Sequence, residues 1–302
     1  MADNVMQQQG ALPPGTGGAA VLWRLIGALT RRVQTFQKQR SMPGYGRLSS
    51  LLRRVLPPYR GVIQLSNGVR MHVDTAVSAE RWLMLSGTYH PALGNLLQQH
   101  VPAGGYCIDA GANLGFFTVQ LAHWVGQSGR VAAFEPNPAM VARIRQNVAA
   151  NAFTQVDVVP KALHDQSGVI QFYVDQDPAK SSLDSTVVRH PADVISAEAM
   201  TLADYVSSAG WTRLDAIKMD IEGNDCRALL AAEAVLERFR PFIVFEYKHD
   251  TDPTIAGPAF AMFTRLGYGL EALAFDGNRF PFDWRQPPPG YKQVDVLCFH
   301  SA

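Results

Sequence analysis

The chain has 302 residues, of which 47% are hydrophobic and 18% are charged. This composition excludes a mainly disordered protein, and three cysteines in so long a chain exclude a disulfide scaffold. No apolar run reaches the roughly 18 residues that a bilayer-spanning helix requires. The net charge of +1 is unevenly distributed, because residues 1–73 hold ten basic residues and one acid, and the remainder holds 17 basic residues and 25 acids. A basic head therefore precedes an acidic body.

The head divides into two parts. Residues 1–20 are small, polar and rich in glycine and proline, which predicts a disordered tail. Residues 21–60 predict a basic amphipathic helical extension, in which the apolar side chains between Val21 and Phe36 share an arc of about 140°. Two interpretations stay open: either the apolar faces pack on the body, or the extension docks on an anionic membrane surface. The absence of a secretory-signal pattern favours a cytoplasmic protein, with possible peripheral membrane contact.

Residues 61–302 predict one α/β domain. An Asn67-Gly68 turn between alternating runs indicates a β-hairpin. Strands and helices then alternate, which predicts a mostly parallel, seven-stranded sheet with helices on both faces and a terminal antiparallel hairpin. Strands are predicted over 106–110, 131–134, 156–159, 214–219, 242–245, 269–275 and 294–300, with an inserted strand over 169–174 before a polar loop at 175–190. Helices are predicted over 116–124, 138–150, 226–239 and 259–266.

A glycine-rich turn lies between the strand at 106–110 and the following helix, in Asp109-Ala-Gly111-Ala-Asn113-Leu-Gly115. The glycines allow a tight turn and the close approach of a ligand. Glu135, which follows the next strand, is placed to accept hydrogen bonds from ribose hydroxyls. This combination predicts a nucleoside-containing cofactor.

Two residues of this turn favour one nucleoside-containing cofactor over another. Asn113 stands where the dinucleotide fingerprint has its second glycine, and Asp109 places a carboxylate near the ligand. A carboxylate suits the sulfonium and ammonium of S-adenosylmethionine better than a pyrophosphate. An NAD-dependent dehydrogenase or epimerase is the alternative, although the chain lacks a Tyr-x-x-x-Lys dyad. Ala162 and Leu163, after the third strand, are the expected neighbours of the adenine.

Acidic residues mark the ends of two later strands. Asp220 and Glu222, two residues apart, would point the same way on an extended chain and could position an acceptor and take its proton. Glu246 and His249 follow the next strand and are further candidate acid/base groups. No metal site is predicted, because two oxygen donors are too few.

Taken together, these motifs resemble the FkbM family of S-adenosylmethionine-dependent methyltransferases. The resemblance covers residues from about 85 to 275 and rests on segments 108–117, 134–138, 159–163, 181–183, 201–204, 217–223 and 242–246. It implies a Rossmann-like class I methyltransferase fold over residues 61–302, with Asn137 added to the cofactor-binding set. Ser181 and Ser182 are expected to line or gate the pocket.

The resemblance also implies the reaction, which is O-methylation of a hydroxyl on a sugar, glycolipid, polyketide or similar metabolite by in-line displacement. Asp220, Glu222, Glu246 and His249 are assigned to the acceptor side. No nucleic-acid partner is expected, because aromatic and basic residues do not interleave around the motifs. A non-catalytic nucleotide-binding protein that docks on membranes through residues 21–60 stays open as the alternative from another functional class.

Overall fold

The computed structural model describes residues 18–19, 21–23, 25–27, 51–52, 54–175, 191–286 and 290–300. Most of the predicted tail, much of the helical extension, and Ser181 and Ser182 lie outside these residues. The chain forms two compact units, Met1–Tyr89 and His90–Ala302. The predicted hairpin lies in the first unit, and the start of the methyltransferase domain at residue 61 stays a prediction.

The first unit contains a two-stranded sheet and a helix. Strands β1 (Arg60–Gln64) and β2 (Arg70–Asp74) pair antiparallel around the Asn67-Gly68 turn, which confirms the predicted hairpin. Helix α3 (Ser78–Ser86) follows. Residues 21–23 and 25–27 are also helical, and the indole Nε1 of Trp23 donates a hydrogen bond to the carbonyl of Pro57 at 2.9 Å. The Trp23 side chain is buried.

The central sheet of the second unit has eight strands in the order β12-β11-β13-β10-β9-β3-β4-β5. The five neighbouring strands from β10 to β5 in this order are parallel. Strand β13 pairs antiparallel with both β10 and β11. The predicted fold class is confirmed, except that the short strand β12 adds an eighth strand at one edge. The strands are β3 (Tyr106–Ala110), β4 (Arg130–Phe134), β5 (Val156–Val159), β9 (Ala216–Met219), β10 (Phe242–Lys248), β11 (Tyr268–Leu273), β12 (Arg279–Pro281) and β13 (Gln293–His300).

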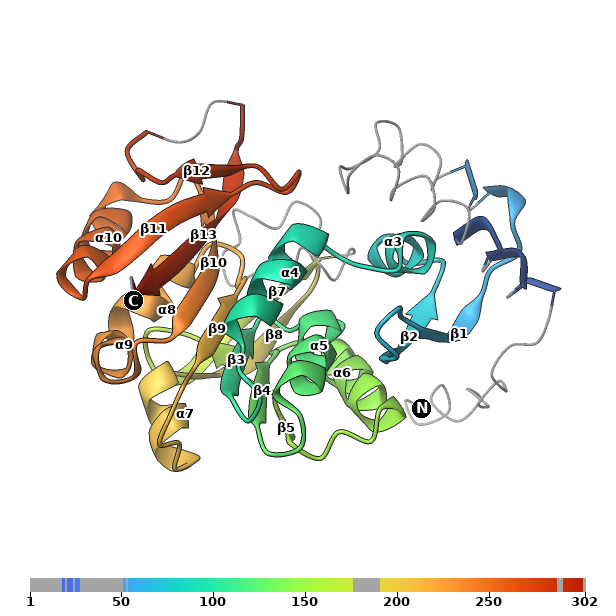
Figure 1. Ribbon diagram of the computed structural model, residues 1–302, viewed down its shortest axis with the longest axis horizontal. Helices are drawn as coiled ribbons and strands as arrows, with labels where there is room; N and C mark the ends of the chain where they lie inside the picture. Colours follow the sequence, from blue (N-terminus) through green and yellow to red (C-terminus); the bar gives the residue numbers. More distant parts are fainter. Residues whose placement is uncertain are drawn as a thin grey trace. The chain divides into compact units, whose positions relative to one another are not determined.

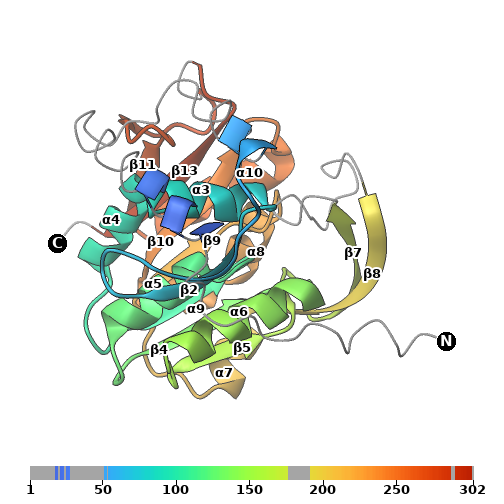
Figure 2. The ribbon, with the colours of Figure 1, turned by 90° about the vertical axis from the view of Figure 1, so that its right-hand side faces the viewer.

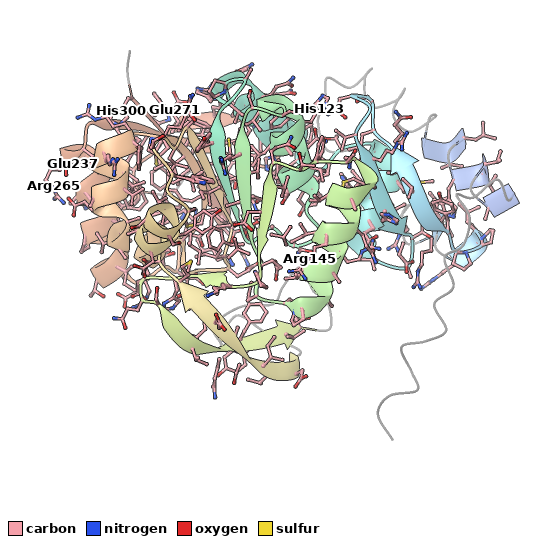
Figure 3. The ribbon with its side chains drawn as sticks, turned by 90° about the horizontal axis from the view of Figure 1, so that it is seen from below. His123, Arg145, Glu237, Arg265, Glu271 and His300 are labelled. Carbon is pink, nitrogen blue, oxygen red and sulfur yellow. The ribbon has the colours of Figure 1, made fainter. Side chains whose placement is uncertain are left out.

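Helices cover both faces of this sheet (Figure 1). One face carries α4 (Pro91–His100), α5 (Phe116–Val125) and α6 (Pro138–Ala150). The other carries α7 (Leu202–Ser208), α8 (Asp225–Ala231), α9 (Glu233–Phe239) and α10 (Pro253–Arg265). Figure 3 shows Arg145 on α6 and Arg265 on α10, on opposite sides of the sheet, and Arg265 forms an ion pair with Glu233 of α9. Each face therefore buries its own apolar layer.

Two predicted helices have different bounds in the structure. The single helix expected over 226–239 is two helices, because the chain turns at Ala232, which ends α8 and begins α9. Alanine favours helix interiors, so the sequence carries no sign of this break. Helix α10 begins at Pro253 instead of residue 259, because Asp252 caps it and accepts a hydrogen bond from the backbone N–H of Thr254.

A second, three-stranded sheet is built from the insertion after β5. Strands β7 (Gly168–Asp175) and β8 (Pro191–Met200) form a long antiparallel pair, and the short β6 (Ala162–Leu163) joins β8. Figure 2 shows β7 and β8 projecting away from the central sheet. The inserted strand is confirmed, whereas its partner β8 was not predicted. Among the described residues, no helix is long and apolar enough to span a membrane.

Candidate functional site

The sequence-predicted site residues gather at one edge of the central sheet. Strands β10, β9, β3 and β4 are neighbours, and their parallel pairing brings their carboxyl ends together. The chain order reverses between β3 and β9, which makes this the topological switch point where open α/β sheets bind ligands. The glycine-rich turn follows β3, and the Asp220–Glu222 segment follows β9 on the other side of that point.

The turn after β3 has the backbone conformation that its glycines predict. Gly111, Asn113 and Gly115 have φ values of 70°, 50° and 80°. A Cβ at Gly111 would lie 1.8 Å from the backbone oxygen of Asp220, so glycine is required there by the neighbouring chain. The backbone N–H of Asp220 also donates to the carbonyl of Ala110 at 3.0 Å. The segment after β9 is therefore packed directly on the glycine-rich turn.

Glu135, at the end of β4, anchors the same turn. Its Oε2 accepts a hydrogen bond from the backbone N–H of Asn113 at 2.8 Å, and its Oε1 accepts one from the N–H of Asn137 at 2.9 Å. The side chain is buried, and this burial raises its pKa to about 7 although both hydrogen bonds oppose the shift. Each oxygen of a carboxylate has room for a second hydrogen bond, so Glu135 can still accept two donors from a ligand.

Asp109 is fully buried and contacts protein groups. Its Oδ2 accepts a hydrogen bond from the Thr118 hydroxyl at 2.6 Å, and its Oδ1 lies 3.4 Å from the ammonium of Lys218 on β9. Lys218 also donates to the carbonyl of Gly111 at 3.1 Å, and its ammonium lies 5.7 Å from the centre of the Phe117 ring. The Asp109–Lys218 pair therefore supports the turn from within the sheet.

The other predicted cofactor residues have structural contacts. The Oδ1 of Asn137 accepts a hydrogen bond from Ala139 N–H at 3.0 Å and so caps α6. Ala162 and Leu163 are buried in β6 and pair with β8. Whether they also contact the adenine stays a prediction.

Four carboxylates at the ends of β9 and β10 interact with one another, and Lys248 pairs with two of them. The Lys248 ammonium is 2.6 Å from Glu222 Oε2 and 3.1 Å from Glu246 Oε2. Gln293 of β13 donates to the other oxygen of Glu246 at 2.8 Å. Asp225 is buried and accepts hydrogen bonds from the backbone N–H groups of residues 221 and 223, each at 3.3 Å. Among the described residues, the Asp220 carboxylate has neither an ion pair nor a hydrogen bond.

The extended geometry assumed for Asp220 and Glu222 does not hold. Strand β9 ends at Met219, and Glu222 has a φ of 55°, so these carboxylates lie in a turn. They are nevertheless close enough to interact. Burial is the main cause that raises the pKa of Glu222, and the negative charge of Asp220 raises this pKa further. The same causes raise the pKa of Glu246 to about 8, and they raise that of Asp225 to about 7.

His249 lies apart from these ion pairs. Both ring nitrogens are buried and have no hydrogen-bond partner among the described residues, and the ring packs edge-on against Tyr247 at a centroid distance of 5.9 Å. In the part of the chain that the structure describes, no group of three or more His, Cys, Asp or Glu residues is arranged to hold a metal ion.

Neither Lys218 nor Lys248 was predicted as a site residue. Lys218 does carry a sequence indication, since it is a lone cation in the otherwise apolar strand β9, and a lysine in a strand covered on both faces requires a partner. Lys248 carries a partial indication, because Glu246 lies two residues earlier on the same strand and shares its face, whereas Glu222 follows β9 and reaches Lys248 only through the pairing of β9 with β10.

A family model described as the methyltransferase FkbM domain matches residues 109–270, which is more than half of the chain. The chain belongs to the FkbM methyltransferase family. It is therefore a methyltransferase, its cofactor is S-adenosyl-L-methionine, and the dehydrogenase alternative is set aside. No curated protein matches the chain.

Several solved structures are similar at low sequence identity. An FkbM methyltransferase from Methylobacillus flagellatus KT is 14% identical, with a TM-score of 0.42, and the match covers 74% of this chain and 54% of that one. An S-adenosylmethionine-dependent O-methyltransferase from Thermotoga maritima is 12% identical, with a TM-score of 0.41 and coverage of 84% and 82%. A putative methyltransferase from Streptococcus mutans in complex with S-adenosylhomocysteine is 12% identical, with a TM-score of 0.40 and coverage of 70% and 99%.

Proposed function

We propose that this methyltransferase methylates a hydroxyl oxygen of a sugar, glycolipid, polyketide or similar metabolite. The observation that carries the proposal is the position of Asp220. Its backbone packs on Gly111 of the glycine-rich turn, and its carboxylate is not engaged by any described residue. A carboxylate beside the cofactor loop can accept the proton that a hydroxyl releases during methyl transfer.

The surrounding charge supports a neutral acceptor. Asp220, Glu222, Asp225 and Glu246 share the edge of the sheet with two described cations, Lys218 and Lys248. An excess of carboxylates repels phosphate groups, whereas carboxylate oxygens are good acceptors for hydroxyl donors. An unphosphorylated polyhydroxylated molecule fits this edge better than a nucleic acid or a phosphorylated sugar.

The residues of the glycine-rich turn fit S-adenosyl-L-methionine. Glu135 retains hydrogen-bond capacity on both oxygens, which suits a pair of ribose hydroxyls, and the acidic edge suits a cation. Bound there, the cofactor supplies a methyl group on a positively charged sulfur. The protein's own contribution is alignment: Glu135 and Lys218 hold the turn, while Lys248 fixes Glu222 and Glu246 beside Asp220.

Transfer of a labelled methyl group tests the proposal. The full chain is incubated with methyl-labelled S-adenosylmethionine and with free sugars, a neutral glycolipid, a hydroxylated polyketide, sugar phosphates or RNA, and each product is analysed by mass spectrometry. We expect label on an oxygen of an unphosphorylated compound. Methylation of nitrogen or carbon, or a preference for the sugar phosphates or RNA, would refute the proposal.

Replacing Glu135 by glutamine is expected to weaken binding of S-adenosylhomocysteine about 10- to 100-fold, because hydrogen bonds to a charged acceptor are lost. Ribose hydroxyls donate stronger hydrogen bonds to an ionised carboxylate than to a protonated carboxyl group. The affinity of the wild-type protein for S-adenosylhomocysteine should therefore increase as the pH rises through about 7, the pKa of Glu135. Calorimetric titration measures both effects. Glu198→Gln, on exposed β8, is the matched control. Wild-type affinity in Glu135→Gln would contradict the ribose assignment.

A further inference from the structure

The helical residues near the start of the first unit expose their apolar side. Val21, Leu22 and Leu25 are 50%, 40% and 63% exposed, and at 100° per residue they share an arc of about 100°. The buried side of the same helix holds Trp23, which is 1% exposed, and Gly27. Val21, Leu22 and Leu25 belong to the predicted apolar arc, yet Trp23, which lies outside that arc, is the residue that packs against protein.

A second helical segment of the first unit, around residues 51–55, also exposes apolar side chains. Leu51 and Val55 are 55% and 64% exposed, and Arg54 is exposed beside them. Residues at positions i, i+3 and i+4 lie on one side of a helix, so the three side chains share a face. The hydrogen bond from Trp23 to Pro57 ties the first segment to the end of the second.

Exposed apolar side chains are concentrated in these two segments. Among the described residues, nine large hydrophobic side chains are exposed, and five of them are the apolar residues just named. Single exposed leucines are ordinary in soluble proteins, whereas a cluster indicates a surface that contacts something apolar. We call Val21, Leu22, Leu25, Leu51, Arg54 and Val55 the apolar–basic face.

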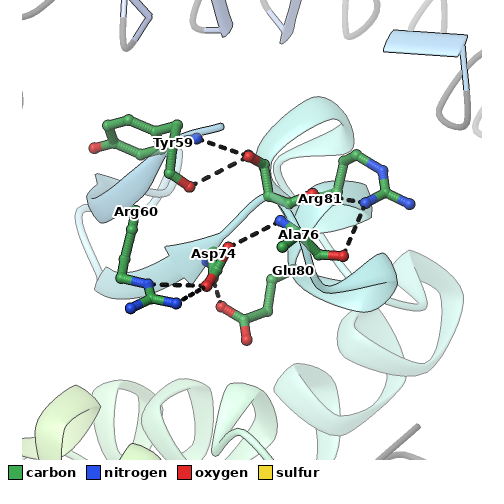
Figure 4. A network of polar contacts seen from close by, with 7 residues as sticks. Tyr59, Arg60, Asp74, Ala76, Glu80 and Arg81 are labelled. Atoms are coloured by element: carbon green, nitrogen blue, oxygen red, sulfur yellow. Dashed lines mark hydrogen bonds and ion pairs between the residues drawn. The ribbon is translucent and has the colours of Figure 1, made fainter. Parts of the chain in front are cut away.

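The charge of this unit is strongly positive. Between residues 18 and 89 the sequence has eleven basic residues and two acids, Asp74 and Glu80. Figure 4 shows that both acids are already engaged: Asp74 pairs with Arg60 at 2.6 Å, and Glu80 is buried and accepts the backbone N–H of Asp74 at 2.6 Å. Against eleven basic residues, these two acids leave a net charge of +9, which attracts an anionic surface.

We propose that the apolar–basic face docks the protein on an anionic lipid membrane. Exposed leucines and valines on helices, combined with excess arginine, match an interfacial helix that inserts its apolar side among acyl chains while basic groups contact lipid headgroups. RNA would use the basic residues but would leave the apolar side chains in water. The combination therefore favours a membrane over a nucleic acid.

Vesicle flotation of the full chain tests the proposal. We expect the wild-type protein to float with vesicles of phosphatidylcholine and phosphatidylserine, to float less with phosphatidylcholine alone, and to dissociate at high salt. Leu22→Ser with Leu25→Ser should weaken binding at least about tenfold, and so should Leu51→Ser with Val55→Ser. Arg54→Gln should weaken it about fivefold. Val169→Ser with Val194→Ser, which removes exposed apolar groups from β7 and β8, is the matched control and should bind as the wild type does.

Three outcomes would overturn the proposal. The first is a wild-type protein that does not float with anionic vesicles. The second is equal loss of binding in the control variant. The third is self-association without lipid, or binding to single-stranded RNA, that the serine variants change while vesicle binding stays the same. Because the substituted side chains are exposed, unchanged thermal unfolding should show that each variant is folded, and the two serine pairs test the face independently.

Discussion

Replacing Asp220 by asparagine is expected to lower kcat about 10²–10⁴-fold, which is the usual contribution of a general base. The reason is that Asp220 provides the carboxylate beside the cofactor loop that no other described residue engages. Asparagine has the same shape and cannot accept a proton at neutral pH. Because the backbone contacts of Asp220 with Ala110 and Gly111 are retained, affinity for S-adenosylhomocysteine should change less than about twofold.

Two measurements distinguish a general base at Asp220 from a cofactor-binding residue. Initial rates with the acceptor identified by methyl transfer give kcat, and calorimetric titration gives the affinity for S-adenosylhomocysteine. Asp193→Asn, on the exposed part of β8, is the matched control and should leave both values unchanged. If Asp220→Asn instead weakened cofactor binding and left kcat unchanged, Asp220 would belong to the cofactor pocket and not to the acceptor side.

Replacing Lys218 by methionine is expected to destabilise the fold by about 3–5 kcal/mol, because the fully buried carboxylate of Asp109 loses its cation. The hydrogen bond to the Gly111 carbonyl is lost as well, so the glycine-rich turn loses its support from β9. Equilibrium unfolding in urea measures the free energy. Affinity for S-adenosylhomocysteine should fall too, because the turn is less well positioned.

A double substitution tests the physical cause. In the Lys218→Met variant, adding Asp109→Asn removes the uncompensated charge and should recover most of the lost stability. Lys161→Met breaks an exposed pair with Glu198, and its free energy of unfolding should stay close to that of the wild type. A loss in Lys218→Met no larger than in Lys161→Met, or no recovery in the double variant, would show that the Asp109–Lys218 pair does not hold the turn.

The predicted central fold was correct because its strands and helices have strong local patterns. The helix at Pro138–Ala150 and the strand at Val156–Val159 have the predicted bounds. Helices α3, α4 and α7 and strand β8 were not predicted. Helix α4 begins at Pro91 and is capped by His90, whose backbone is left-handed and whose Nδ1 accepts a hydrogen bond from the N–H of Leu93. Histidine is not a usual cap, so this helix start has little local signal in the sequence.

The carboxylates of the site were identifiable one by one, but their pairing was not. The motif at residues 217–223 indicated Asp220 and Glu222 as acceptor-side residues, and the end of the next strand indicated Glu246. Lys248 lies two residues after Glu246 on the same strand, but only the parallel pairing of β9 with β10 brings Glu222 to it. The Asp220 carboxylate is left without a hydrogen bond or an ion pair among the described residues. For Asp109 the cofactor contact stays a prediction, and the tertiary structure adds that this carboxylate is a fully buried partner of Lys218.

The sequence by itself determined the family, the alternating architecture and the acidic body, because these depend on local motifs and on composition. The tertiary structure decided which charges neutralise one another, because ion pairs form between strands that are far apart in the chain. It also decided which side of the first helix faces solvent. Periodicity shows that a helix has an apolar side, but only the burial of Trp23 shows that the opposite side is the one packed against protein.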